Sequence, residues 1–168
     1  MTQVYLGLGS NIDRHRHITA ALDALSRAYG ELSLSSVFES EAVGFDGSPF
    51  FNTVVGLTTE QSIAQLSAHF KRIEDANGRR RDGPKFSPRT LDIDILLYGD
   101  WVGNCAGVSL PRDEITQNAF VLWPLAQIAP EQEHPTLNLS FAQLWAEYDK
   151  ERQKLWPVPF LWQGRNLS

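Results

Sequence analysis

Four stretches of the chain combine alternating polarity with aliphatic and β-branched residues, which predicts four β-strands. These strands are expected at residues 4–10, 32–40, 51–59 and 90–98. The first stretch breaks at Gly9, Ser10 and Asn11, as a strand that enters a turn does. Residues 41–49 contain two glycines and a proline and predict a loop between the second and third strands.

Two further stretches carry apolar residues at helical spacing. The first helix is expected to be capped by Asn11 or Asp13 and to end at Gly30. The second is expected to be capped by Thr59 and to end at Gly78. The apolar faces consist of Ile18, Ala21, Leu22 and Leu25 in the first helix, and Ile63, Leu66, Phe70 and Ile73 in the second.

The expected order is strand, helix, strand, strand, helix, strand, which is typical of the α+β ferredoxin-like fold with both helices on one sheet face. We expect one domain over residues 1–168, with its core at about residues 3–131 and a C-terminal helix and apolar tail within 132–168. Shorter pieces are also predicted: an edge hairpin at 100–109, apolar turns at 120–130, a short helix at 140–150 and a tail at 155–168 that packs on the body or on a partner.

Composition narrows the class of protein. The 168 residues have a net charge of -5, which disfavours a nucleic-acid binder. Cys105 is the only cysteine, so no internal disulfide forms. The sequence shows neither a basic, apolar leader nor a run of about 18 apolar residues. We therefore expect a cytoplasmic protein that has no membrane contact, no nucleic-acid partner and no obligate protein partner.

Two aspartates interrupt the apolar fourth strand. Residues i and i+2 of a strand point to the same face, so Asp92 and Asp94 project together while Leu91, Ile93 and Ile95 enter the core. At a separation of roughly 6.6 Å two such charges repel by about 2.5 kcal/mol at an effective dielectric of 20. Paired carboxylates of this kind suit Mg²⁺, which keeps several waters and commonly bridges to substrate phosphates.

A basic loop precedes this strand. Residues 78–89, GRRRDGPKFSPR, carry five cationic side chains against one aspartate in a chain that is acidic as a whole. Arginine forks match phosphate geometry, so the loop is a candidate for binding a polyphosphate. The alternative is that Asp92 and Asp94 only form ion pairs with Arg81 or Arg89 on a solvated surface. The GLGSN stretch at 7–11 is best interpreted as a turn that ends a strand.

The motifs together resemble a known family. GLGSN, FESEAVGFDGSPFFN, RIEDANGRRR, PRTLDIDILLYGD and LPRDEITQNAFVLWPLAQIAP are similar to the corresponding segments of the 6-hydroxymethyl-7,8-dihydropterin pyrophosphokinases, over about residues 3–131. The resemblance implies a ferredoxin-like fold and transfer of diphosphate from ATP to a pterin hydroxymethyl group in folate biosynthesis, with release of AMP. It also implies two Mg²⁺ ions held by Asp92 and Asp94.

The resemblance further implies three sets of site residues. The catalytic set is Arg79, Arg89, Asp92 and Asp94. The pterin set is Ser40, Val43, Gly44, Phe50, Asn52 and Phe120, with the two phenylalanines stacking on the ring. The ATP set is Lys71, Glu74, Arg81, Phe86, Arg89, Ile95, Ser109 and Arg112.

Some positions depart from the family pattern. Lys71, Gly107, Arg112, Asp113 and Asn118 stand where the family usually has glutamine, arginine, histidine, an aromatic residue and arginine. A non-catalytic or altered-specificity paralogue that binds a pterin or a nucleotide is therefore the alternative function. An RNA-binding domain of the same topology is disfavoured by the acidic charge and the missing aromatic motif.

Overall fold

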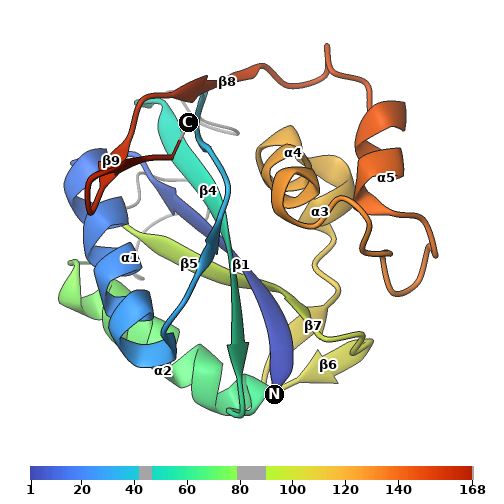
Figure 1. Ribbon diagram of the computed structural model, residues 1–168, viewed down its shortest axis with the longest axis horizontal. Coiled ribbons are helices and arrows are strands. Elements are labelled where there is room, and N and C mark those ends of the chain that lie inside the picture. The colour runs from blue at the N-terminus through green and yellow to red at the C-terminus, as the bar shows by residue number, and fades with distance from the viewer. Residues whose placement is uncertain (42–46, 79–89, 168) are drawn as a thin grey trace.

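The computed structural model of the chain describes residues 1–41, 47–78 and 90–167. Its centre is an antiparallel sheet of six strands (Figure 1). In spatial order, the main path runs through β5 (Asp92–Tyr98), β1 (Thr2–Ser10), β4 (Phe50–Thr59), β3 (Val37–Ser40) and β8 (Leu155–Val158), and β2 (Ser33–Leu34) pairs with β4.

Helices lie on both faces of this sheet (Figure 1). α1 (Arg14–Tyr29) and α2 (Ile63–Ala76) cover one face, where Val4, Leu6 and Leu8 of β1 are buried. α3 (Glu114–Gln117), α4 (Ala119–Ile128) and α5 (Phe141–Glu147) form a second layer, which packs against Tyr5 and Val54 on the opposite face. Within the described residues, none of these helices has the length and apolarity to cross a membrane.

The order of β1, α1, β3, β4, α2 and β5 confirms the expected α+β fold. The expected second strand is divided into β2 and β3. The division lies at Ser35, whose hydroxyl accepts a hydrogen bond from the Val54 N–H (2.9 Å) and also contacts Thr53 Oγ1 (3.0 Å). Serine side chains compete in this way with the regular ladder of a sheet.

The helix caps differ in part from expectation. α1 has Asp13 as its N-cap residue, one of the two candidates. The expectation that Thr59 caps α2 is wrong, because Thr59 is the last residue of β4. The cap is Ser62, whose hydroxyl accepts from the Gln65 N–H (3.2 Å) while the Gln65 side chain accepts from the Ser62 N–H (2.8 Å). This is a capping box, which satisfies two backbone donors at once.

The apolar turns expected at 120–130 are instead mostly the helix α4. This segment lacks an amphipathic pattern because α4 is packed between the sheet and α5, and a helix buried on several sides is apolar all round. The expected hairpin near residues 100–109 is present as β6 (Gly103–Cys105) and β7 (Val108–Leu110).

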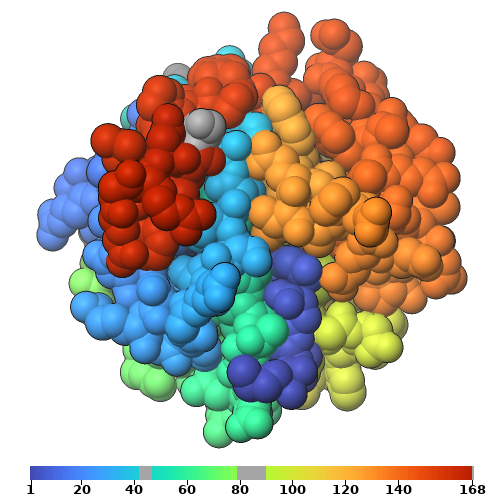
Figure 2. All heavy atoms as spheres, viewed as in Figure 1, coloured from blue at the N-terminus to red at the C-terminus, as the bar shows by residue number. Residues whose placement is uncertain are grey.

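The tail packs on the body of the protein. After β8, the short strands β9 (Leu161–Trp162) and β10 (Arg165–Asn166) form a hairpin against α1, and Figure 2 shows this dark red segment beside the blue helix. Trp162 Nε1 donates to Asp23 Oδ1 (2.9 Å), and the rings of Phe160 and His15 stack at 4.4 Å.

Candidate active site

The sheet face under α4 carries a row of small and polar residues. Strand register places Asp92 of β5 beside Gly9 of β1, Gly9 beside Asn52 of β4, and Asn52 beside Phe38 of β3. In the same way, Asp94 lies beside Gly7. Glycine at these two positions adds no side chain to this face of β1, so the carboxylates of β5 and the amide of Asn52 border one strip, which the Leu96 side chain covers at Gly7.

A buried glutamate fixes the backbone between the two aspartates. Glu74 of α2 is 6% exposed, and its Oε2 accepts a hydrogen bond from the Ile93 N–H at 2.8 Å. Leu91, Ile93 and Ile95 are buried on the α1 and α2 side, which confirms that Asp92 and Asp94 share the other face. β5 therefore presents both carboxylates from a strand that is anchored on its reverse side.

The electrostatics of Asp94 are unusual for an aspartate. Burial, followed by the negative charge of Asp92, raises the pKa of Asp94 to about 8, although the Arg112 guanidinium lowers it. A cation bound next to such a carboxyl group lowers its pKa, because a positive charge stabilises the ionised form.

Arg112 supplies one positive charge near Asp94. Its Nη2 lies 3.7 Å from Asp94 Oδ1 and 2.7 Å from Glu114 Oε1, and its backbone N–H donates to the Leu96 carbonyl at 3.1 Å. Burial lowers the pKa of Arg112, but the charges of Asp94 and Glu114 outweigh it and the pKa is raised. Glu114 is the closer partner, so Arg112 divides its positive charge between Asp94 and Glu114.

The donor set of Asp92 and Asp94 fits a hard divalent cation. Among the described residues no group of three or more metal-binding side chains occurs, and Asp92 and Asp94 offer two carboxylates. Mg²⁺ is bound in this manner, through one or two carboxylates and substrate phosphates.

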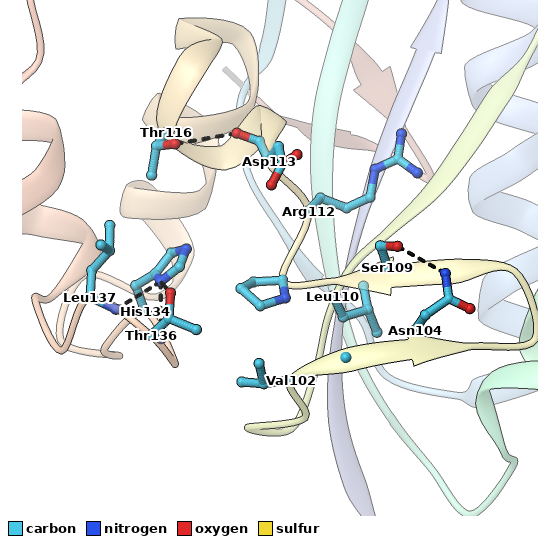
Figure 3. Close-up of a pocket in the computed structure, with 12 residues that line it drawn as sticks. Val102, Asn104, Ser109, Leu110, Arg112, Asp113, Thr116, His134, Thr136 and Leu137 are labelled. Carbon is cyan, nitrogen blue, oxygen red and sulfur yellow. Dashed lines mark hydrogen bonds between the residues drawn. The ribbon is translucent and has the colours of Figure 1, made fainter.

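A cavity of about 450 Å³ lies next to Arg112, between the β6–β7 hairpin, α3 and the segment around His134. Figure 3 shows Ser109 and Arg112 on one side of it, and His134, Thr136 and Leu137 on the other. His134 Nδ1 accepts from the N–H groups of Thr136 (3.3 Å) and Leu137 (3.2 Å), which holds that wall in place. The volume is in the usual range for a small-molecule site.

Three of the predicted pterin residues, Ser40, Phe50 and Asn52, lie together on β3 and β4 at the other end of the strip. Asn52 is 7% exposed, and its Nδ2 donates to Ser40 Oγ at 2.8 Å. Phe50 is half-buried on the same face of β4, and Phe120 is half-buried in the first turn of α4 above that face. The arrangement offers an amide and a hydroxyl at the sheet and an aromatic residue from each layer.

Two contacts at this end escaped the sequence analysis. Asn11 Nδ2 donates to the Ser48 carbonyl at 3.1 Å, and Arg14 Nη1 donates to the Pro49 carbonyl at 3.2 Å. The GLGSN turn thus also anchors the segment that leads into Phe50. The one sign of this anchoring role in the sequence is that Asn11 follows a Gly-Ser pair that ends a strand.

The remaining predicted residues lie apart or outside the described chain. Ile95 packs in the core under α1 and α2, so only its backbone can face a ligand. Lys71 is exposed on α2. The predictions for Val43, Gly44, Arg79, Arg81, Phe86 and Arg89 fall outside the described residues.

Most of the chain matches a known family of proteins. The model of the 7,8-dihydro-6-hydroxymethylpterin-pyrophosphokinase (HPPK) family matches residues 5–130. The chain belongs to the HPPK family.

Individual HPPK relatives agree with this assignment. The chain is 36% identical over 137 residues to the 2-amino-4-hydroxy-6-hydroxymethyldihydropteridine pyrophosphokinase of Aquifex aeolicus, which covers 80% of this chain and 85% of the relative. It is 38% identical over 147 residues to the protein of the same name from Porphyromonas gingivalis, which covers 83% of this chain and 100% of the relative.

Solved structures support the fold. A Plasmodium falciparum HPPK-DHPS structure with pteroate aligns with a TM-score of 0.67 at 16% identity, over 88% of this chain and 43% of that chain. The wild-type HPPK-DHPS structure aligns with a TM-score of 0.68 at 15% identity, over 99% of this chain and 47% of that chain. The HPPK chain described here thus spans less than half the length of those solved chains.

Proposed function

We propose that the protein transfers diphosphate from ATP to the hydroxymethyl group of 6-hydroxymethyl-7,8-dihydropterin, giving AMP and the pterin diphosphate in folate biosynthesis. The observation that carries the proposal is the pair Asp92 and Asp94, anchored at Ile93 and bordered by both a ligand-sized cavity and a polar-aromatic corner. Two relatives of the chain are named as pyrophosphokinases, so the non-catalytic alternative is not favoured.

The pterin is proposed to lie between Phe50 and Phe120. Its edge would meet the Asn52 amide and the Ser40 hydroxyl, whose mutual hydrogen bond of 2.8 Å fixes the amide orientation. A flat heterocycle gains stacking energy between two aromatic rings, and a fixed amide selects its donor and acceptor pattern. In this pose the hydroxymethyl group points along the strip above Gly9 toward the aspartates.

The nucleotide is proposed to approach from the opposite side. Its base and ribose would occupy the cavity beside Ser109 and Arg112, and its triphosphate would extend over Asp92 and Asp94. The guanidinium of Arg112, 3.7 Å from Asp94, lies where it can bind a phosphate oxygen. The basic residues of 78–89, including Arg79, Arg81 and Arg89, are proposed to add positive charge from the sequence-adjacent loop.

In the proposed reaction, the hydroxymethyl oxygen of the pterin attacks the β-phosphorus. The bond from that phosphorus to the α–β bridging oxygen breaks, AMP leaves with the oxygen, and the hydroxyl proton is released. Two Mg²⁺ ions on Asp92 and Asp94 would supply charge neutralisation of the phosphates. The protein holds the reactants in line and offsets developing charge, which are the main contributions that an enzyme makes to phosphoryl transfer.

The proposal is tested by incubating the protein with Mg-ATP and the dihydropterin and measuring AMP and pterin diphosphate. Asp92→Ala and Asp94→Ala should each lower turnover by at least about 100-fold, in line with loss of several kcal/mol of charge stabilisation. Asp100→Ala is the matched control, because Asp100 is an exposed carboxylate just beyond β5. Equal AMP formation by all four proteins would contradict the proposal.

The number of bound ions is measured separately by titrating Mn²⁺ in the presence of a non-hydrolysable ATP analogue. We propose two ions per chain, and loss of ion binding in Asp94→Ala. The expected cytoplasmic location and independence from an obligate protein partner remain predictions.

A further inference from the structure

The proposed pterin slot is assembled from two separate layers. Ser40, Phe50 and Asn52 belong to strands β3 and β4, whereas Phe120 belongs to helix α4. The width of the slot therefore depends on what fixes the first turn of α4 above the sheet. An aromatic stack is sensitive to such spacing, because ring contacts need centroids about 4.5–7 Å apart.

The first turn of α4 is fixed by a side chain from the tail. Asn118 is the N-cap residue, and its side chain forms no capping hydrogen bond among the described residues. Instead, Gln153 Oε1 accepts from the Ala119 N–H at 2.8 Å, and Gln153 Nε2 donates to Asn118 Oδ1 at 2.8 Å. Tyr148 Oη adds a third bond, to the Gln117 carbonyl at 2.8 Å.

The same segment of the tail is also tied to the sheet. Two residues beyond Gln153 the chain enters β8, and Leu155 pairs with Ser40 at the end of β3. Residues 148–158 therefore connect the start of α4 to the strand that carries the Ser40 hydroxyl. This segment lies beyond the residues 5–130 that match the family model.

We propose that Gln153 is a positioning residue for the pterin site: its amide clamps Asn118 and Ala119 and so sets the distance of Phe120 from the sheet. The inference rests on the proposed function. Replacing the Gln153 amide would leave α4 attached to the sheet through the contact between the Trp123 and Phe38 rings, whose centroids are 4.6 Å apart. The first turn of α4 would then be free to shift. We expect Gln153→Ala to weaken the affinity for the pterin and to leave the affinity for ATP nearly unchanged.

The chain provides a matched control on the same helix. Gln127, in the last turn of α4, accepts from the Ser36 N–H at 2.9 Å through Oε1 and donates to Ser36 Oγ at 3.2 Å through Nε2. Gln127→Ala therefore removes the same side-chain amide and two hydrogen bonds, but at the end of α4 remote from Phe120.

A conservative variant provides a rescue. Gln153→Glu keeps an acceptor for the Ala119 N–H, and the Asn118 amide can turn to donate to the second carboxylate oxygen. A negative charge at a helix N-terminus is also favourable. This variant should retain the clamp that Gln153→Ala removes.

The experiment measures steady-state kinetics, dihydropterin binding by fluorescence and thermal unfolding for the three variants and the unsubstituted protein. Gln153→Ala should raise the pterin KM and Kd by about fivefold to tenfold, equivalent to roughly 1–1.4 kcal/mol, with the ATP KM within about twofold. Gln127→Ala should lower the Tm by about as much as Gln153→Ala does. The pterin affinity of Gln127→Ala and of Gln153→Glu should stay within about twofold of that of the unsubstituted protein.

The positioning role is overturned if Gln153→Ala and Gln127→Ala change pterin binding equally, or if neither changes it. An unsubstituted protein that neither binds the pterin nor forms AMP would instead overturn the proposed function itself, and the inference with it.

Discussion

At the scale of single residues, Gly9 lies where the carboxylate strip meets the pterin corner. A β-carbon added at Gly9 would lie 3.3 Å from Asn52 Oδ1 and 3.8 Å from Phe50 Cδ1. A β-carbon added at Gly7 would meet only the Leu96 side chain, at 3.5 Å or more. The two glycines therefore differ in what they protect, although both lie in β1.

We predict that Gly9→Ala raises the pterin KM by about three- to tenfold. The added methyl group displaces the Asn52 amide by a few tenths of an ångström, and a lost hydrogen bond costs about 0.5–1.5 kcal/mol. Gly7→Ala should leave the pterin KM unchanged. Steady-state kinetics with varied dihydropterin at saturating ATP check both. A larger pterin defect in Gly7→Ala would show that the slot lies elsewhere.

Asp94 gives the metal-free protein a specific dependence on pH. Because its pKa in the folded protein is raised to about 8, folding favours the protonated carboxyl. The stability that this group contributes is complete below its unfolded pKa and is lost as the pH rises from about 4 toward 8, with a slope of at most about 1.4 kcal/mol per pH unit.

We predict that Asp94→Asn removes this part of the pH dependence. Urea unfolding in EDTA should show the variant gaining stability relative to the unsubstituted protein as the pH rises from 5 to 8. Parallel pH profiles for the two proteins would contradict the prediction. Saturating Mg²⁺ should lower the pKa of Asp94 and so reduce the difference in pH-dependent stability between Asp94→Asn and the unsubstituted protein.

At the scale of elements, β5 depends on a side chain from another element. Its first residues carry the carboxylates, and α2 holds them through Glu74 and the Ile93 N–H. A regular antiparallel ladder with β1 continues only after a bulge, because Tyr5 pairs with Leu97 but Leu6 pairs with Ile95. The extra residue, Leu96, is buried together with Leu97 against the layer formed by α3, α4 and α5.

We predict that Glu74→Ala lowers the free energy of unfolding by about 1–3 kcal/mol, since it leaves the buried Ile93 N–H without its acceptor. Glu74→Gln keeps an acceptor oxygen and should lower it by less than about half as much. Chemical denaturation measures both, and equal losses would mean that the charge of Glu74 rather than the hydrogen bond matters.

The sequence predicts the strands and helices whose apolar residues recur at a regular spacing within the element itself. The alternation of Leu91, Ile93 and Ile95 with the two aspartates places the carboxylates correctly. It gives no sign of the bulge at Leu96, because a bulge follows from the fit between two strands. α4 was missed because a buried helix has no polar face. Ser62 was missed because Thr59, three residues earlier, is also of a type that caps helices.

The candidate site was predicted less completely than the fold. The neighbours of Asp92, Asp94, Ser40 and Asn52 follow from strand register and from the alternation of side chains along a strand. Asn11, Arg14 and Gln153 form side-chain hydrogen bonds that span 34 or more residues of sequence. Such contacts leave no periodic signal in the chain.

At the scale of the whole molecule, ligands that bind across the two layers should stabilise the fold as a unit. Any ligand that binds only the folded state adds about 2.7 kcal/mol at 100 times its Kd. For a domain of this size that corresponds to a rise in Tm of about 5–10 °C.

We predict such a rise when the dihydropterin, Mg²⁺ and a non-hydrolysable ATP analogue are added together, with a smaller rise for the pterin alone. EDTA should abolish the nucleotide-dependent part, because it removes the divalent ions that are proposed to bridge the triphosphate to Asp92 and Asp94. Differential scanning fluorimetry measures each step. A nucleotide effect that persists in EDTA would contradict a metal bridge at these residues.

The pairing of β8 with β3 joins residues 155–158 to residues 37–40, a loop closure of more than a hundred residues. Contacts this distant in sequence form slowly and are completed late in folding. During synthesis on the ribosome, β3 therefore lacks its β8 neighbour until residues 155–158 have emerged. Substrate recognition would then be among the last properties that the nascent protein acquires.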